Sequence, residues 1–245
     1  MADRWFELAS TEHFWIQRRF DVLRSLAGDL ILASREIAEF GCGNGLVQRQ
    51  VEVAFDKAVT GFDLNEYALK KNLSEKSPVC CYDVLQMNEE LRGKFDLIFL
   101  FDVLEHIEDE VGFLKALAFH LAEKGKVIVN VPAGMWAYSA YDTAAGHLRR
   151  YVGKSLEQAA VRNRWRVRGW TYWGLPLAPT LVLRKVWLMG IRGEDNIIKS
   201  GFDPGSKWLN RAMALLSKCE KIPQKLLGTS LMAILEEQRE TDEVG

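Results

Sequence analysis

Length, composition and charge describe an ordinary globular chain. It has 245 residues, of which 48% are hydrophobic and 27% charged, enough for one sizeable core with at most a small appendage. Its 32 basic and 33 acidic residues leave a net charge of −1, so no overall basic field indicates a nucleic-acid partner. The segment Met1–Gly28 is too charged for a signal peptide, and we expect a cytoplasmic protein.

The first half of the chain alternates between two kinds of pattern. Apolar residues at helical spacing predict a helix over Thr11–Ala27 and another over Asp109–Glu123, the latter followed by Gly125. Strand-like runs recur at Glu36–Phe40, Ala58–Asp63, Val79–Asp83, Phe95–Asp102 and Lys126–Val131. Runs such as FDLIFLF are continuously apolar, as expected for strands covered on both faces. The alternation predicts an α/β fold with a doubly wound, Rossmann-like, mostly parallel sheet and helices on both faces.

The pattern changes after Pro132. Residues 133–151 lack clean periodicity and are expected to form a loop over the carboxyl end of the sheet. The remaining segments predict helices at Lys154–Asn163, Leu175–Leu188 and Lys207–Lys218, and strands at Trp165–Trp173 and Gly228–Glu237. The sheet therefore has seven strands, with a helical insertion before the last strand. The acidic residues after Glu236 are expected to fray.

The chain has four cysteines and none of them forms a C-x-x-C pair. They are Cys42, Cys80, Cys81 and Cys219. Because Cys80 and Cys81 are adjacent in a strand-like run, their side chains should alternate between its two faces. We expect buried free thiols and no metal site here.

Three alternating glycines follow the first strand, in the segment EFGCGNG. Gly41, Gly43 and Gly45 can adopt positive φ angles and carry no Cβ, so a ligand can lie against the main chain at a helix amino terminus. A tight strand-to-helix turn without any ligand is the alternative explanation of such a pattern.

Acidic residues at the strand ends favour the ligand. Glu39, Asp63, Asp83 and Asp102 should line the carboxyl edge of one sheet, where open α/β sheets bind ligands. Asp63 lies 22 residues after Gly41, and a carboxylate there can accept two hydrogen bonds from a ribose diol. Such a ring would repel a pyrophosphate but suits a cation that carries a ribose.

These motifs resemble the class I S-adenosylmethionine (SAM)-dependent methyltransferases. EFGCGNG, GFDLN, YDV, FDLIFLFDVLEHIED and GKVIVNVPA are similar to successive motifs of that family and together cover residues 36–133. The spacing G-x-G-x-G differs from the G-x-G-x-x-G of dinucleotide enzymes. The resemblance implies that Asp63 binds the ribose and Asp83 the adenine. The implied cofactor-binding set is Arg19, Glu39, Gly41, Cys42, Gly43, Asn44, Gly45, Asp63, Leu64, Asp83, Val84, Phe101 and Asp102.

Two further segments resemble a bacterial group within this family that tailors small molecules, quinone-like lipids or glycans. EHFWIQRR implies that Arg19 contacts the SAM carboxylate and that Trp15 covers the pocket; plain helix packing is the alternative. YDTAAGHLRRY resembles a D-x(3)-G-H-x-R-R-Y run after the fifth strand, whose arginines suit an acidic acceptor or a structural ion pair. The implied acceptor-binding set is Trp15, Trp136, Tyr141, Arg149, Arg150 and Tyr151.

The resemblance also implies how the chain is divided. Residues 1–245 form one methyltransferase domain, with an N-terminal helical segment (1–32), a SAM-binding core with an acceptor loop (33–174), a helical cap (175–227), a closing strand (228–237) and a frayed tail (238–245). The uncharged run Gly169–Leu183 is too short to span a bilayer and contains two prolines. Core packing in a cap is the default reading; peripheral membrane contact through 169–190 is the alternative.

Methyl transfer requires alignment of acceptor and methyl group, and an oxygen acceptor also requires a base. His106 lies just past the fourth strand and His147 in the acceptor loop, so both are candidate bases. Either could instead be structural, and His120 is expected to be a surface or structural residue. Asp102, Glu105 and Asp142 could in principle hold a metal, but their spacing has no metal signature and we expect no metal.

The predicted function is SAM-dependent methyl transfer to a small-molecule, glycan or lipid-linked acceptor, at oxygen. A methyltransferase-like subunit that binds SAM without turnover is the second hypothesis. An NAD-dependent oxidoreductase is the third, and the glycine spacing and the acidic strand ends disfavour it.

Overall fold

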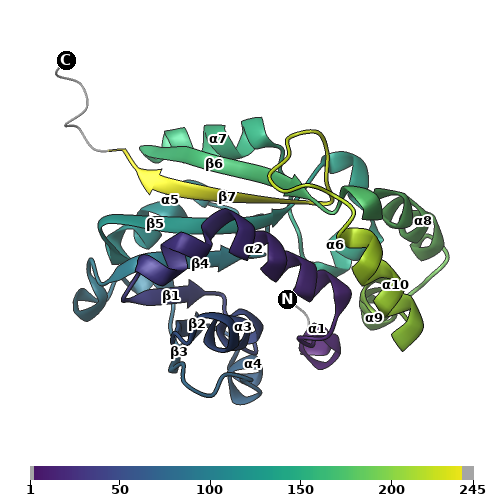
Figure 1. The fold of residues 1–245 in the computed structure, drawn as a ribbon, viewed down its shortest axis with the longest axis horizontal. Coiled ribbons are helices and arrows are strands. Elements are labelled where there is room, and N and C mark those ends of the chain that lie inside the picture. Colours follow the sequence, from purple (N-terminus) through teal and green to yellow (C-terminus); the bar gives the residue numbers. More distant parts are fainter. Residues whose placement is uncertain (1–2, 239–245) are drawn as a thin grey trace.

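A mixed β-sheet lies at the centre of the fold. The structure is a computed structural model that describes residues 3–238. Seven strands lie in the order β3-β2-β1-β4-β5-β7-β6, and β7 runs antiparallel to both of its neighbours (Figure 1). Their bounds are β1 Ile37–Phe40, β2 Thr60–Asp63, β3 Val79–Cys81, β4 Phe95–Phe101, β5 Leu121–Pro132, β6 Trp165–Trp173 and β7 Ser230–Glu237. The predicted doubly wound α/β fold is confirmed.

The central strand β4 explains the continuous apolar runs. Ile98 and Leu100 point into the core on one face of the sheet, and Leu97 and Phe99 into the core on the other. All four are at most 1% exposed. A strand covered by helices on both faces needs apolar residues at every position, because neither face meets water.

Helices cover both faces of the sheet (Figure 1). The helices of the first half are α1 Asp3–Leu8, α2 Phe14–Ala33, α3 Leu46–Phe55, α4 Glu66–Lys70, α5 Glu110–His120 and α6 Ala140–Ala145. Those of the second half are α7 Gly153–Arg162, α8 Ala178–Leu188, α9 Glu194–Phe202 and α10 Lys207–Ser217. Short 3-10 turns occupy Val84–Gln86 (η1), Glu89–Leu91 (η2), Leu104–His106 (η3), Met135–Ala137 (η4) and Leu175–Leu177 (η5).

Two predicted helix ends, several helices and the predicted loop over residues 133–151 differ from the structure. α2 continues past a non-helical residue, Ala27 (φ −140°), to Ala33, and its second part buries Ile31. α5 ends at His120 rather than Glu123, because Leu121 already pairs with Phe95 as the start of β5. The short helices α1, α4, α6 and α9 were not predicted. The prediction that residues 133–151 form a loop was wrong for α6, which begins at a capping box of Ser139 and Asp142 and ends at its C-cap, Gly146. The predicted frayed tail, apart from its first residue, lies outside the described residues.

The expectation of buried thiols was wrong for three of the four cysteines. Cys42 is buried, but Cys80, Cys81 and Cys219 are exposed. Cys80 and Cys81 lie in β3, the edge strand of the sheet, and all three residues of β3 are exposed. A strand-like pattern predicts burial only if something covers the strand, and burial is a tertiary property.

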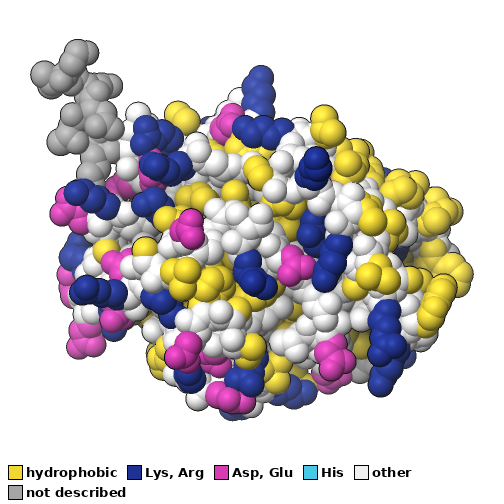
Figure 2. Space-filling view, in the orientation of Figure 1, with side chains coloured by type: hydrophobic (Ala, Val, Ile, Leu, Met, Phe, Trp, Pro, Cys, Tyr) yellow, Lys and Arg dark blue, Asp and Glu magenta, His cyan; other side chains and the backbone are white. Residues whose placement is uncertain are grey.

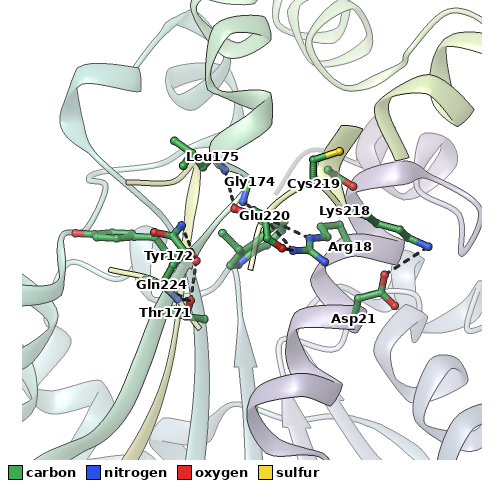
Figure 3. A network of polar contacts seen from close by, with 12 residues as sticks. Arg18, Asp21, Thr171, Tyr172, Gly174, Leu175, Lys218, Cys219, Glu220 and Gln224 are labelled. Atoms are coloured by element: carbon green, nitrogen blue, oxygen red, sulfur yellow. Dashed lines mark hydrogen bonds and ion pairs between the residues drawn. The ribbon is translucent and has the colours of Figure 1, made fainter. Parts of the chain in front are cut away.

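The insertion between β6 and β7 forms a helical cap. Helices α8 and α9 pack against α6 and each other, and α9 also packs against α1. The chain returns from the cap through a polar network centred on Glu220 (Figure 3), whose carboxylate accepts hydrogen bonds from the main-chain N–H groups of Gly174 (2.7 Å) and Leu175 (3.0 Å) and pairs with Arg18. This network ties both ends of the cap to α2. Within residues 3–238, no helix has both the length and the apolar character needed to cross a bilayer.

Candidate active site

A cavity of about 540 Å³ lies at the carboxyl ends of β1, β2 and β4. Its volume lies within the range of about 300–1,000 Å³ that is typical of small-molecule sites. The walls come from the strand ends on one side, and from α1, α2, α6 and the cap helices on the other. The cap thus covers part of the open edge of the parallel sheet and supplies a second side of the site.

The glycine loop forms one wall. Gly41, Gly43 and Gly45 have φ angles of +78°, +54° and +76°, which L-residues with side chains rarely adopt. A Cβ on Gly41 would lie 2.3 Å from Val103 Cγ2, and one on Gly43 would lie 2.6 Å from Phe6 Cε1. Gly45 is the N-cap of α3 and does not line the cavity. The loop therefore requires glycine for its own packing, and it leaves main chain exposed to the cavity.

Acidic strand ends surround this loop. Asp63 accepts hydrogen bonds from the main-chain N–H groups of Gly43 (2.7 Å) and Asn65 (2.8 Å), and Asp83 caps η1 by accepting from Leu85. Glu39 is 3% exposed, and its Oε2 has no hydrogen-bond partner. Burial raises the pKa of Glu39 to about 8. An unpartnered carboxyl oxygen at a cavity wall is suited to a ligand that donates a hydrogen bond or carries positive charge.

Arg19 crosses the cavity wall from α2 to the end of β4. Its Nη1 lies 2.5 Å from Asp102 Oδ2, and its guanidinium lies over the rings of Trp15 (4.9 Å) and Phe101 (5.4 Å). Asp102 also accepts a hydrogen bond from the Asn130 side chain at 2.9 Å. Burial raises the pKa of Asp102, and the charge of Arg19 counteracts that rise. Arg19 thus already has a partner, and its contact with a SAM carboxylate stays a prediction.

The D-x(3)-G-H-x-R-R-Y run fastens the acceptor loop. Asp142 is fully buried and accepts hydrogen bonds from Ser139 N–H (2.9 Å), His147 Nδ1–H (2.9 Å) and Arg150 Nε–H (2.7 Å). Burial opposes its ionisation, but the hydrogen bond from His147 and the charge of Arg150 lower the pKa of Asp142 to about 2. Tyr151 donates to the carbonyl oxygen of Leu104 at 3.2 Å. The motif therefore ties the acceptor loop to the turn after β4.

Both candidate bases lie on the cavity wall, next to one another. The His106 and His147 ring centroids are 4.9 Å apart, and His106 Nδ1 lies 3.0 Å from the Gly146 carbonyl oxygen. Burial lowers the pKa of His106 to about 4, and it raises the pKa of the adjacent Glu105 well above the usual range. His120 is structural, as expected: its ring contacts the Tyr82 hydroxyl (2.8 Å) inside the core.

The cavity collects most of the predicted site residues. Those on its wall are Trp15, Arg19, Glu39, Gly41, Cys42, Gly43, Asn44, Asp63, Leu64, Asp83, Val84, Phe101, Asp102, His106, Tyr141, His147 and Arg150. Three predicted acceptor residues are not among its lining residues: Trp136, which is exposed; Arg149, which pairs with Glu110 at 2.8 Å; and Tyr151, which is buried in the core. Adjacent positions in a loop point in different directions, and one cavity cannot receive all of them.

Sequence reasoning predicted the helical cap and named Glu105 as a possible metal ligand, but it missed Arg184 and the full burial of Glu105 at the cavity wall. Arg184 of α8 lines the cavity, lies 4.6 Å over the Tyr141 ring and donates to the carbonyl oxygen of Gly201. Its only sequence signal was a basic residue after an uncharged run. Glu105 is fully buried, which no local pattern indicates because the residue sits in a short turn.

A family model and curated relatives match this chain over part of its length. A family model described as "Methyltransferase domain" matches residues 13–175. The chain is 33% identical over 105 residues to a tRNA U34 carboxymethyltransferase of Aliarcobacter butzleri (40% of this chain, 34% of that protein). It is 29% identical over 139 residues to a ubiquinone biosynthesis O-methyltransferase of Aromatoleum aromaticum (53% of this chain, 58% of that protein). The matches thus span 34% and 58% of the length of these relatives.

Solved structures of low sequence identity share the fold. A putative sarcosine dimethylglycine methyltransferase from Galdieria sulphuraria superposes with a TM-score of 0.60 at 12% identity, covering 91% of this chain and 85% of that one. A SAM-dependent methyltransferase from Archaeoglobus fulgidus gives a TM-score of 0.56 at 16% identity, covering 90% and 94%.

Proposed function

The chain belongs to the methyltransferase-domain family, with the fold of the class I SAM-dependent enzymes, and from that premise we propose that it transfers a methyl group from SAM to a hydroxyl oxygen of a small or lipid-linked acceptor. The observation that supports the proposal most is the continuity of the cavity. One end is lined by the glycine loop and acidic strand ends, and the same cavity reaches the two histidines under the cap.

The walls of the first end fit SAM. The glycine loop lines the cavity at Gly41 and Gly43, Asp63 and Asp83 suit a ribose and an adenine amino group, and the unpartnered oxygen of Glu39 suits an ammonium group. When bound, SAM supplies a methyl group activated by its sulfonium. The chain's own residues have to orient the two reactants and exclude water.

The second end would orient the acceptor. His106 donates through Nδ1 to a carbonyl oxygen, so Nε2 is the nitrogen that can accept a proton or another electrophile. His147 is fixed in the same way by Asp142. The cap contributes apolar side chains to the wall around this end, among them Leu177, Leu181 and Ile198. An acceptor with a hydroxyl next to an apolar body matches both features.

The outer surface of the cap favours an acceptor carried by lipid. Figure 2 shows hydrophobic side chains gathered where α8 lies in Figure 1. The exposed apolar residues of α8 and α10 are Val182, Leu183, Val186, Trp187, Trp208, Leu209, Leu215 and Leu216. Lys185, Lys207 and Arg211 lie on the same helices. Large exposed apolar side chains beside basic ones are typical of elements that lie in an anionic membrane interface.

Two experiments test these proposals in turn. The first is calorimetric titration with S-adenosylhomocysteine (SAH) of the wild type, Gly43→Ala and Asp63→Ala. Gly93→Ala is the matched control, because Gly93 also has a positive φ (+60°) but is not among the cavity-lining residues. We expect SAH binding to be lost in the first two variants only. Absence of binding by the folded wild type would contradict the proposal, and binding without transfer of a labelled methyl to any acceptor would favour the non-catalytic SAM-binding subunit.

The second experiment is co-sedimentation with vesicles of phosphatidylglycerol or phosphatidylcholine. We expect binding to the anionic vesicles, lost in Leu183→Ser/Trp187→Ser. The control is Val161→Ser, because Val161 is also exposed but lies on α7, away from the cap. Equal sedimentation of the wild type and the double variant would contradict the membrane proposal without touching the proposed reaction.

A further inference from the structure

Three potential metal ligands converge at the acceptor end of the cavity. Glu105 and His106 come from the turn η3 after β4, and His147 comes from the acceptor loop, 41 positions later in the chain than His106. One ligand atom from each lies within 4.8 Å of the other two. His147 Nε2 lies 3.9 Å from Glu105 Oε1, too far for a hydrogen bond between them.

Three buried polar atoms of this cluster have no hydrogen-bond partner in the protein. Glu105 is fully buried, and neither of its carboxyl oxygens has a hydrogen-bond partner. Nε2 of His106 is likewise buried without a partner. Buried polar atoms are almost always satisfied, and an unsatisfied set that shares one point of a cavity indicates a bound group. In its deprotonated form the Glu105 carboxylate offers only acceptors, as do the imidazole lone pairs, so a group that satisfies all of them is an electrophile or a donor.

The outer contacts of the histidines match those of metal ligands. His106 Nδ1 lies 3.0 Å from a carbonyl oxygen of Gly146, and His147 Nδ1 lies 2.9 Å from the Asp142 carboxylate. Both partners only accept, so each Nδ1 carries the proton and each Nε2 offers a lone pair. Histidines that bind metals are held in this way, with the second ring nitrogen donating to a carboxylate or a carbonyl. Asp142 and Gly146 therefore act as positioning residues.

We propose that Glu105, His106 and His147 bind one divalent transition-metal ion, with zinc as the best match. Two imidazoles and one carboxylate suit zinc, manganese or iron rather than magnesium or calcium, which prefer all-oxygen sites. Ligand atoms sit about 2.0–2.2 Å from zinc, so the three residues have to draw together by roughly an ångström when the ion binds. The spacing of these residues along the chain does not indicate a metal site, because the three ligands meet only when the acceptor loop packs against the turn after β4.

The site has a position open to the cavity, and its role rests on the proposed function. Three protein ligands leave a fourth coordination position, and all three residues line the cavity. An acceptor hydroxyl that replaces water at this position loses its proton to solvent more readily, because the cation stabilises the oxyanion. This arrangement gives the acceptor oxygen its nucleophilic form without requiring a strongly basic histidine.

Metal binding can be tested without knowing the acceptor. Zinc chloride is titrated into untagged full-length protein stripped by chelator, with the exposed Cys80, Cys81 and Cys219 replaced by serine to remove competing thiols. We expect one equivalent of zinc to bind, with at least a tenfold loss of affinity in Glu105→Gln and in His106→Gln. The matched control is His13→Asn, since His13 also lines the cavity but its Nε2 already contacts the Phe202 carbonyl oxygen. Asp142→Asn should weaken binding less than loss of a ligand does.

A second readout separates the site from folding and from the proposed function. Cobalt(II) substitution should give the visible absorption of a four- or five-coordinate ion in the wild type and lose it in Glu105→Gln, while circular dichroism and SAH titration of the same samples report on folding. Two outcomes would overturn the metal site: no zinc binding by the wild type, or an unchanged zinc affinity in the folded variants Glu105→Gln and His106→Gln. If the wild type binds SAH but no zinc, the metal site is contradicted and the proposed methyl transfer is not. If it binds zinc but not SAH, the metal site is supported and the proposed function is contradicted.

Discussion

The ion pair between Arg19 and Asp102 should be the main electrostatic support of the cofactor wall. The two side chains are 6% and 14% exposed, and Nη1 and Oδ2 are 2.5 Å apart. In Arg19→Met the guanidinium is lost, while the Asp102 carboxylate stays buried with only the Asn130 amide as a side-chain partner. Breaking a buried pair by removing one partner costs roughly 3–5 kcal/mol. Since Asn130 remains and Asp102 is not fully enclosed, we expect about 3 kcal/mol at pH 7.

A double-mutant cycle measures this coupling. The free energy of unfolding is determined by urea denaturation for the wild type, Arg19→Met, Asp102→Asn and the double variant. Because the double variant contains no uncompensated charge, it should be more stable than the sum of the single changes predicts, by roughly 1–3 kcal/mol. Additive effects, or a cost below 1 kcal/mol in Arg19→Met, would refute the reasoning. Parallel SAH titrations show whether Arg19 also contributes to cofactor binding.

Further predictions concern two titratable groups and one tryptophan. Burial lowers the pKa of His13 from 6.5 to about 4, so between these pH values only the unfolded state binds the proton, and the free energy of unfolding falls as the pH falls. We expect urea denaturation to show a loss of about 2 kcal/mol between pH 7 and pH 5 in the wild type, and no such loss from this group in His13→Asn. Burial raises the pKa of Glu39 to about 8, so its carboxyl group ionises only as the pH approaches 8. Because the ionised form attracts the ammonium group of SAH, SAH should bind roughly tenfold more tightly at pH 8 than at pH 6.5. An SAH affinity that does not change with pH in the wild type, or that changes equally in Glu39→Gln, would contradict this. Trp173 donates to Asn130, which in turn holds Asp102, so Trp173→Phe should cost about 1–3 kcal/mol of stability, and an unchanged urea midpoint would show that the bond is dispensable.

Local chemistry made the cofactor end predictable. The positive-φ glycines, the acidic residue at each strand end and the apolar run of β4 are properties of short segments, and each determines its structure within a few residues. The strand Trp165–Trp173 was predicted with the bounds that the structure gives it. The cofactor residues therefore meet at one edge because parallel strands of one sheet place their carboxyl ends together.

The acceptor end depended on contacts between distant segments. His106 and His147 were recognisable as candidate bases, but their proximity to each other and to the buried Glu105 arises when the acceptor loop bonds to the turn after β4, through Tyr151 to Leu104 and through Leu148 to Glu105. Likewise, the pattern of α8 indicated an apolar helix without showing that Arg184 reaches the cavity. The sequence by itself determined the sheet and its ligand-binding edge, because periodicity and backbone freedom are local. Only the tertiary structure decided what surrounds the acceptor, because the burial and pairing of its side chains are set by residues far away in the chain.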